Sequence, residues 1–199
     1  MVKPFRYAIA LTGGIATGKS TVVSFLKSWG YEIIDADSIA HEILDAQYLE
    51  VAKLFGQEFI QDKKVKRPAL GKIIFGNEQN KKALESLLHP LIFAKIKRLS
   101  NIEEKKQKYY FIDIPLFFET SRYEIAKVLL IYTAPKIQLQ RLMARNDFSK
   151  EDAKLRIQSQ IPIDEKVAKS TYLIDNSATL TDLENTIRNV LKDIEKDFK

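Results

Sequence analysis

The 199-residue sequence contains no cysteine, and this absence excludes both disulfide bonds and thiolate metal sites. No apolar run approaches the roughly 18 residues that a membrane-spanning helix requires. The apolar stretch that follows Lys3 and Arg6 is too short for a signal peptide. These absences together favour a cytoplasmic protein without a membrane segment.

The charge balance favours anionic partners but does not indicate nucleic acid. Lysine and arginine total 32 against 26 acidic residues, a net charge of +6. The short basic clusters at residues 63–67 and 105–108 contain or adjoin acidic residues, and the sequence has no aromatic signature of RNA-binding domains. We therefore expect small-molecule nucleotides rather than nucleic acid as partners.

The segment Gly13–Ser20 matches the phosphate-binding-loop pattern G-x-x-x-x-G-K-[ST] at every fixed position. An apolar run at residues 7–11 precedes it and an amphipathic segment at residues 22–29 follows, as the strand–loop–helix context of the motif requires. The alternative is a glycine-rich turn that matches by chance. The residues predicted to bind ATP in this loop are Gly13, Gly14, Ala16, Thr17, Gly18, Lys19, Ser20 and Thr21.

The chemistry expected of this loop follows from its backbone. Glycines let successive amide N–H groups turn toward a phosphate, and the following helix directs its positive end at the same anion. Lys19 offers a positive charge to the outer phosphates, and Ser20 offers a hydroxyl to Mg²⁺. The loop alone therefore predicts that a nucleotide phosphate is bound.

Strands that alternate with helices predict an α/β fold with a doubly wound, five-stranded parallel sheet flanked by helices. Continuous apolar runs are typical of strands covered on both faces. The expected strands are residues 7–11, 31–34, 109–113, 127–132 and 171–174. The expected helices are residues 18–30, 38–45, 48–55, 68–75, 78–102 with a kink or split at Pro90, 135–145, 149–160, and a C-terminal helix capped at Thr181.

The order of these elements predicts one P-loop kinase domain over residues 1–199. Its core would comprise residues 1–55, 109–135 and 170–199, with a helical acceptor-binding insertion at about 56–105 and a lid at about 139–162. Ligands of such folds bind at the carboxyl ends of the strands. Asp35, Asp37 and Asp113 are all expected at those ends.

Two aspartates are candidates for different tasks. Asp113 closes an apolar strand and is placed to hold Mg²⁺ directly or through water, although a helix or turn cap is the alternative. Asp37 could accept the proton of an alcohol as the phosphoryl group arrives. A phosphate acceptor would need no such base, and the residues alone do not decide between the two acceptors.

Arginines precede the last predicted strand. Arg141 and Arg145 are four residues apart and therefore share one helical face, and Arg156 follows on the next helix. In a nucleotide kinase, a lid at this place supplies cations to the transferring phosphoryl group and excludes water. The alternative is a solvated face with exposed ion pairs.

Several stretches resemble the dephospho-coenzyme A kinase family, which belongs to the P-loop kinases of the nucleoside-monophosphate-kinase type. The most specific are Asp35–Asp37, His89–Pro90 and Asp113–Glu119, because the phosphate loop itself is shared by many families. The similar stretches also include residues 11–21, 34–40, 67–75, 84–92, 138–145, 156–160 and 174–176.

The resemblance implies an enzyme that uses ATP and Mg²⁺ to phosphorylate the ribose 3′-hydroxyl of dephospho-coenzyme A, the last step of coenzyme A synthesis. It implies a cytoplasmic monomer or small homo-oligomer without nucleic-acid or membrane partners. Its implied catalytic residues are Asp37, Lys19 and Arg141, its further ATP contacts are Arg141, Arg145 and Asn176, and its metal ligands are Ser20 and Asp113. Its implied acceptor contacts are Asp37, Arg67, His89, Asp113, Pro115, Leu116 and Glu119. His89 precedes a proline on an apolar helix and is interpreted as a structural rather than a catalytic histidine.

The chain departs from the family pattern at two places. His41 stands where the family usually has arginine, so a charge contact is weakened or supplied elsewhere, for example by Lys53. Ala16–Thr17 stands where the family often has glycine and serine. We expect little harm at Ala16, provided that its φ angle is negative.

Three other functions remain open at this point. Another small-molecule or nucleoside monophosphate kinase would share the loop and the lid but phosphorylate a different acceptor. A nucleic-acid-binding ATPase would exploit the basic charge and bind with steep salt dependence. A nucleotide-sensing domain would bind ATP without turnover.

Overall fold

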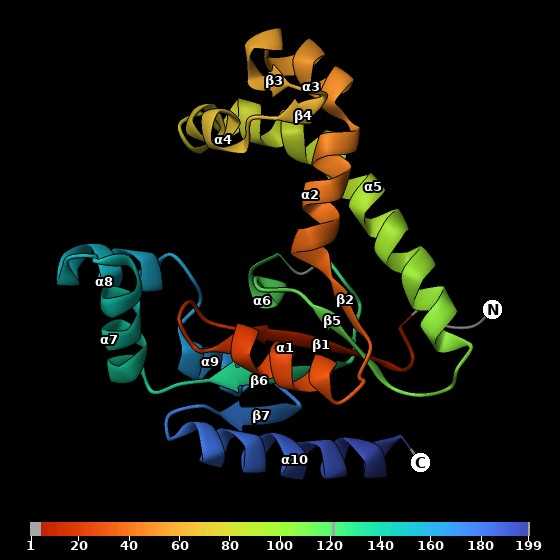
Figure 1. Cartoon of the computed structure of the whole chain (residues 1–199), viewed down its shortest axis with the longest axis vertical. Coiled ribbons are helices and arrows are strands. Elements are labelled where there is room, and N and C mark those ends of the chain that lie inside the picture. Colours follow the sequence, from red (N-terminus) through yellow and green to blue (C-terminus); the bar gives the residue numbers. More distant parts are fainter. Residues whose placement is uncertain (1–4, 121, 199) are drawn as a thin grey trace. The chain divides into compact units, whose positions relative to one another are not determined.

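The computed structural model describes residues 5–120 and 122–198, which form two compact units (Figure 1). The core unit comprises the described residues up to Ile34 and from Ser100 onward, and the inserted unit comprises Asp35–Leu99. No helix in these ranges is both long and apolar enough to cross a membrane.

The main sheet has the predicted five-stranded α/β architecture, with strand order β2-β5-β1-β6-β7. The strands are β1 (Ala8–Gly13), β2 (Ile33–Asp35), β5 (Tyr110–Asp113), β6 (Lys127–Tyr132) and β7 (Tyr172–Asp175). Strand β1 pairs in parallel with β5 and β6, and its register places Leu11 beside Asp113 and Gly13 beside Ile131. The carboxyl ends of β1 and β5 therefore meet at one edge of the sheet.

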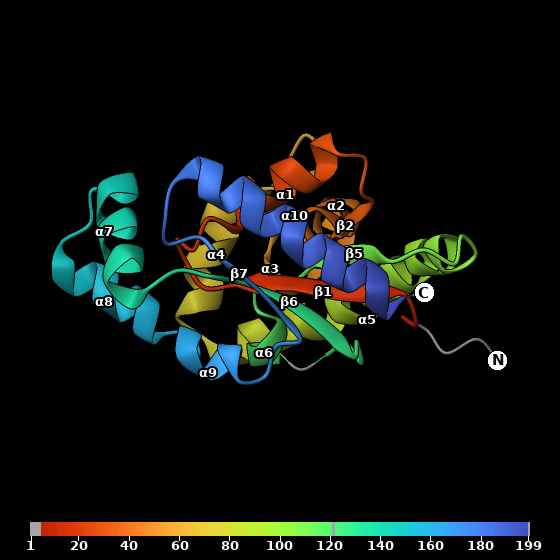
Figure 2. The same ribbon diagram turned by 90° about the horizontal axis from the view of Figure 1, so that it is seen from below.

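Helices cover both faces of this sheet, as the continuous apolar strands predicted. Helices α1 (Lys19–Ser28) and α10 (Leu180–Asp197) lie over one face, on the opposite side from α6 (Phe117–Thr120) and α9 (Ile163–Val167) (Figure 2). The core between α1, α10 and the sheet contains buried side chains from each layer: Ile9, Leu11, Val22, Leu26, Phe111, Leu129, Ile131, Ile174, Leu183, Ile187, Leu191 and Ile194.

Helix α7 (Pro135–Asn146) and helix α8 (Lys150–Gln158) agree with the helices predicted at residues 135–145 and 149–160, and Ser149 caps α8 by accepting from the Asp152 N–H at 3.1 Å. The residue predicted to cap the C-terminal helix was wrong. Thr179 rather than Thr181 is the N-cap, because Thr179 and Asp182 complete both hydrogen bonds of a capping box. The short helix α9 was not predicted.

The inserted unit contains α2 (Ala36–Ala46), α3 (Tyr48–Phe55), the 3₁₀ turn η1 (Gln57–Phe59), the strands β3 (Ile60–Gln61) and β4 (Lys64–Val65), and α4 (Arg67–Phe75). Val51, Val65 and Leu70 form its small buried core. The β3–β4 hairpin was missed, because Asp62 and Lys63 both adopt positive φ angles there without the glycine that usually marks such a turn.

Of the kink or split predicted at Pro90, the split is wrong, because helix α5 runs without a break over Glu78–Glu104. Proline removes one backbone hydrogen bond and crowds the preceding turn, but it does not by itself end a helix. Leu88 and Ile96 are buried on either side of Pro90, and this packing stabilises the helix across the proline.

Candidate active site

The phosphate loop lies between the end of β1 at Gly13 and the start of α1 at Lys19, as the motif predicted. Gly18 is the N-cap of α1 and has a left-handed φ of 86°. The loop therefore delivers the chain directly into the N-terminus of α1, where unpaired N–H groups favour an anion.

Three carbonyl groups of the loop are held by side chains from later in the chain. Lys166 Nζ donates to Gly13 O at 3.2 Å, and Gln138 Nε2 donates to Ile15 O at 2.6 Å. Asn176 Nδ2 donates to Thr17 O at 2.9 Å. Three alternate peptide groups of the loop are thus fixed from outside the loop.

These contacts determine where the loop N–H groups point. A trans peptide is planar, so its N–H and C=O groups point in opposite directions. Fixing the three carbonyls turns the N–H groups of Gly14, Ala16 and Gly18 the other way, and within the described chain none of these N–H groups donates to protein. They form the concave set of donors that a phosphate requires.

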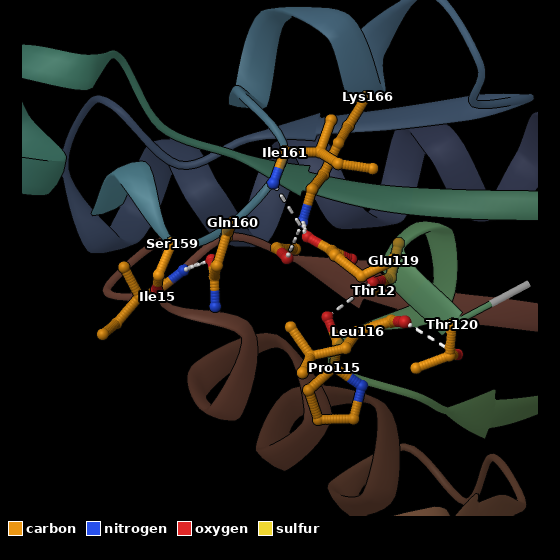
Figure 3. A network of polar contacts seen from close by, with 12 residues as sticks. Thr12, Ile15, Pro115, Leu116, Glu119, Thr120, Ser159, Gln160, Ile161 and Lys166 are labelled. Carbon is orange, nitrogen blue, oxygen red and sulfur yellow. Dashed lines mark hydrogen bonds and ion pairs between the residues drawn. The ribbon is translucent and has the colours of Figure 1, made fainter. Parts of the chain in front are cut away.

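The peptide between Gly14 and Ile15 is held in the opposite sense. The Ile15 N–H donates to Gln160 Oε1 at 2.8 Å (Figure 3), so both polar groups at Ile15 contact glutamine side chains. Gln138 lies in α7 and Gln160 follows α8. The loop is therefore attached near both ends of the helix pair α7–α8, which we predicted from the sequence to be a lid.

Close packing explains the glycines of the motif. A Cβ atom on Gly14 would lie 2.7 Å from Gln138 Nε2, and one on Gly18 would overlap Asn176 Nδ2. The expectation for Ala16 was wrong, because its φ angle is +61°. An L-residue other than glycine pays about 1–2 kcal/mol in this conformation, so the loop carries strain at Ala16.

The lysine of the motif contacts the aspartate at the end of β5. Lys19 Nζ lies 2.5 Å and 2.6 Å from the two carboxylate oxygens of Asp113, and the Asp113 side chain is only 8% exposed. The predicted phosphate ligand and the predicted metal ligand therefore form an ion pair with each other.

Arg141 and Arg145 lie beside the loop on α7. Together with Ala16 and Ala144 they line a cavity of about 410 Å³. Arg141 Nη1 donates to Thr133 Oγ1 at 3.2 Å, whereas Arg145 is exposed and bonds to Asn146. Two cations thus border an open space next to the donors of the phosphate loop. Arg156 instead stacks on the Phe148 ring at 4.3 Å.

The Asp113–Glu119 stretch contacts the end of β1, just before the phosphate loop. Thr12 Oγ1 donates to Pro115 O at 3.0 Å, and the Leu116 side chain is exposed. Glu119 on α6 forms an ion pair with the buried Lys166 at 2.6 Å (Figure 3). The Glu119 carboxylate is therefore engaged with the protein, whereas Leu116 faces solvent.

The other predicted acceptor contacts belong to the inserted unit. Asp37 is exposed in the first turn of α2, and Asp35 caps that helix by accepting from the Ser38 N–H at 2.9 Å. Arg67 forms a 2.6 Å ion pair with Asp45. Burial opposes the ionisation of Asp45, but the hydrogen bonds from Arg67 and the Val65 N–H outweigh it and lower the pKa of Asp45.

His41, the first of the two departures, and His89 also lie in the inserted unit. His41 is exposed on α2, and His89 is half-buried on α5. Lys53, the suggested substitute for the missing arginine, forms an exposed ion pair with Glu50 at 2.7 Å. Its charge is thus partly compensated within α3.

Sequence reasoning assigned no role to Gln138, Gln160 or Lys166, three of the side chains that hold the loop. Gln138 and Gln160 occur in the stretches that resemble the family, which was the available signal for them. Lys166 gave no signal, because a lysine in a polar segment is normally read as exposed. Asn176 was predicted as an ATP contact, and the structure places its amide on the loop backbone.

Gly18 and Gly30 provide a matched pair of substitutions. Both have positive φ, at 86° and 84°, but a Cβ atom on Gly30 would meet nothing within 4 Å. We expect Gly18→Ala to weaken ATP binding by more than about 10-fold because it displaces Asn176, with strain adding about 1 kcal/mol of destabilisation. Gly30→Ala should be destabilised by the same strain, about 1 kcal/mol, but should retain its affinity for ATP. Calorimetric titration with ATP and urea unfolding of both variants test this, and equal ATP affinities would contradict it.

A parallel sheet with a phosphate loop after its first strand, a loop lysine and an arginine-bearing helix beside it defines the P-loop kinases. The sequence model of the dephospho-CoA kinase family matches residues 7–182. The chain belongs to the dephospho-CoA kinase family.

Individual relatives agree over nearly their whole lengths. The chain is 45% identical to a dephospho-CoA kinase of Sulfurimonas denitrificans, covering 98% of this chain and 97% of the relative. It is 42% identical to one of Wolinella succinogenes, covering 99% of each. The solved dephospho-CoA kinase from Campylobacter jejuni superposes with a TM-score of 0.80 at 40% identity, covering 97% of this chain and 99% of that one.

Proposed function

We propose that this protein transfers the terminal phosphoryl group of ATP to the ribose 3′-hydroxyl of dephospho-coenzyme A and yields coenzyme A and ADP. It is a phosphotransferase with an alcohol acceptor, at the last step of coenzyme A synthesis. Phosphoryl transfer is supported by the N–H groups of Gly14, Ala16 and Gly18, which lie in the loop that precedes Lys19. These N–H groups point away from the side chains that hold the carbonyl groups of the same peptides. The identity of the acceptor is supported by family membership.

The Lys19–Asp113 pair supports a role for both side chains in this transfer. A nucleotide phosphate offers Lys19 a second anion, and movement of Lys19 toward it would break the ion pair with Asp113. Ser20 is exposed in the first turn of α1, where its hydroxyl has no protein partner in the described chain. In this proposal Lys19 exchanges the Asp113 carboxylate for a nucleotide phosphate when the nucleotide binds.

Ser20 and Asp113 are the proposed protein ligands of Mg²⁺. The described residues contain no cluster of three or more histidine or acidic side chains. This fits a magnesium ion held mainly by phosphates and water with one or two protein oxygens. When bound, Mg²⁺ neutralises the charge that develops on the phosphate oxygens.

Asp37 is the proposed general base. An alcohol acceptor must lose its proton as the phosphoryl group arrives, and the exposed Asp37 carboxylate is available to accept it. Arg67, His89, Asp113, Pro115, Leu116 and Glu119 are the other proposed residues on the acceptor side. Arg141 and Arg145 would stabilise the transferring group, which accumulates negative charge on its equatorial oxygens.

We further propose that residues 56–105 present the acceptor and that residues 139–162 close over the nucleotide as a lid. The attachments of Ile15 to Gln138 and Gln160, at the two ends of the lid, support a link between lid position and loop geometry. The protein would act in the cytoplasm as a monomer or small homo-oligomer, without nucleic acid.

The decisive experiment measures turnover with competing acceptors. Purified protein with ATP, Mg²⁺ and dephospho-coenzyme A should release ADP and form coenzyme A, identified by its mass. Adenosine and AMP, supplied at the same concentration, should compete poorly and be phosphorylated much more slowly. Preferred phosphorylation of AMP would indicate a nucleoside monophosphate kinase, and ADP release only with DNA or RNA would indicate a nucleic-acid-dependent ATPase. ATP binding without turnover would indicate a nucleotide sensor.

A further inference from the structure

Lys166 is a fully buried lysine to which the proposed reaction assigns no task. It lies on α9 and is 0% exposed, which is exceptional for a lysine. Its ammonium group contacts Glu119 Oε1 at 2.6 Å (Figure 3). It also donates to Gly13 O at 3.2 Å. Three segments that are far apart in the sequence, the end of β1, α6 and α9, therefore meet at one cation.

Fold stability alone is a weak reason for this arrangement. A buried ion pair gains little over apolar side chains of similar volume, because both charges lose their hydration. The Glu119 carboxylate is also incompletely satisfied. Its Oε1 atom accepts from Lys166 and from the Ile161 N–H at 3.2 Å, whereas its buried Oε2 atom has no partner in the described structure. The ion pair costs free energy as a structural feature, so the second contact of the Lys166 ammonium group, to Gly13 O, needs its own explanation.

The contact to Gly13 acts on the first N–H group of the phosphate loop. The Gly13 carbonyl and the Gly14 N–H belong to one planar peptide, so a donor on the carbonyl side turns the N–H toward the phosphate side. Gln138 and Asn176 act in the same way on the peptides that follow Ile15 and Thr17. Lys166 differs from them because it is charged and buried, and Glu119 neutralises that charge.

We propose that Lys166 is a positioning residue of the nucleotide site: it fixes the Gly13–Gly14 peptide so that the Gly14 N–H faces the bound phosphate. Glu119 anchors the ammonium group at the carbonyl and keeps it from becoming a phosphate ligand itself. The proposal rests on the proposed function only in that the loop binds a nucleotide phosphate. It does not depend on which acceptor is phosphorylated.

The test separates nucleotide affinity from fold stability. In Lys166→Met, the unbranched side chain fills similar space but cannot donate, and Glu119 is left as an unpaired buried charge. We expect lower stability in urea and a Kd for ADP raised about 10-fold, the factor that corresponds to one ordinary hydrogen bond. The double variant Lys166→Met/Glu119→Gln removes the unpaired charge, so its stability should recover while its ADP affinity remains low.

Two further variants complete the comparison. Glu119→Gln alone leaves Lys166 as a buried cation without its anion, but the amide oxygen can still accept from Lys166 and keep it at Gly13 O. This variant should therefore bind ADP more tightly than the double variant does. Lys169→Met replaces an exposed lysine three residues along the chain and should change neither property. If Lys166→Met does not fold, the comparison of the double variant with Glu119→Gln gives the same answer.

A double variant that regains wild-type ADP affinity together with its stability would overturn the proposal, because Lys166 would then be merely structural. Wild-type affinity in Lys166→Met would overturn it as well. ADP binding is measured without dephospho-coenzyme A, so the result is independent of whether that acceptor is phosphorylated.

Discussion

Lys19→Met is expected to lower kcat by about 10²–10³-fold, the loss measured when one preorganised transition-state donor is removed from an enzyme. The substitution removes the only charge that the loop motif itself offers to the outer phosphates, while the backbone N–H groups of the loop remain. ADP affinity should therefore fall much less than kcat does. Steady-state kinetics with ATP and Mg²⁺, together with calorimetric titration with ADP, measure the two effects separately.

The ion pair between Lys19 and Asp113 requires a control for this variant. Removing Lys19 leaves the nearly buried Asp113 carboxylate without that cation, so some loss of stability is expected for reasons unrelated to catalysis. The double variant Lys19→Met/Asp113→Asn removes both charges and should regain stability without regaining activity. A double variant with restored kcat would show that Lys19 acts only by neutralising Asp113.

Asp37→Asn is expected to lower kcat by about 10²-fold or more, with a modest change in ATP affinity, because it removes the proposed base and leaves the phosphate loop intact. Asp37 is exposed in the first turn of α2, so the isosteric amide should be tolerated by the fold. The measurement is kcat at saturating ATP and dephospho-coenzyme A, with urea unfolding to verify stability.

Asp35→Asn is the matched control for Asp37→Asn. It removes a carboxylate two residues away, and asparagine caps a helix about as well as the Asp35 side chain does. A general loss of negative charge would slow both variants similarly, whereas the loss of a base would slow only Asp37→Asn. A near-normal kcat in Asp37→Asn would remove this residue from the proposed role.

Features that depend on a few neighbouring residues were predictable from the sequence. The loop pattern from Gly13 to Ser20 predicted the turn between β1 and α1, and Ser149 with Asp152 predicted the start of α8. The apolar runs of β5 and β6 predicted strands covered on both faces. Each of these depends on local sterics, capping or hydrophobic periodicity, which a short stretch of sequence encodes.

Local rules failed where packing overrode them. Pro90 lies within a continuous α5, and Ala16 adopts a positive φ that its own side chain disfavours. The β3–β4 hairpin turns at Asp62 and Lys63, although neither residue is glycine. In each case surrounding contacts supply the free energy that the residue itself does not, and a single sequence does not display those contacts.

The sequence by itself determined the fold class, the phosphate loop with Lys19, and, through resemblance, the family that the comparisons confirm. Only the tertiary structure decided how the N–H groups of that loop are oriented toward a phosphate. The side chains of Gln138, Gln160 and Lys166 act on loop atoms 123, 145 and 153 residues away along the chain. Such contacts form only when the chain folds, because they join residues that are far apart in the sequence. They orient the N–H groups of the loop because each peptide is planar, so holding its carbonyl group fixes the direction of its N–H group.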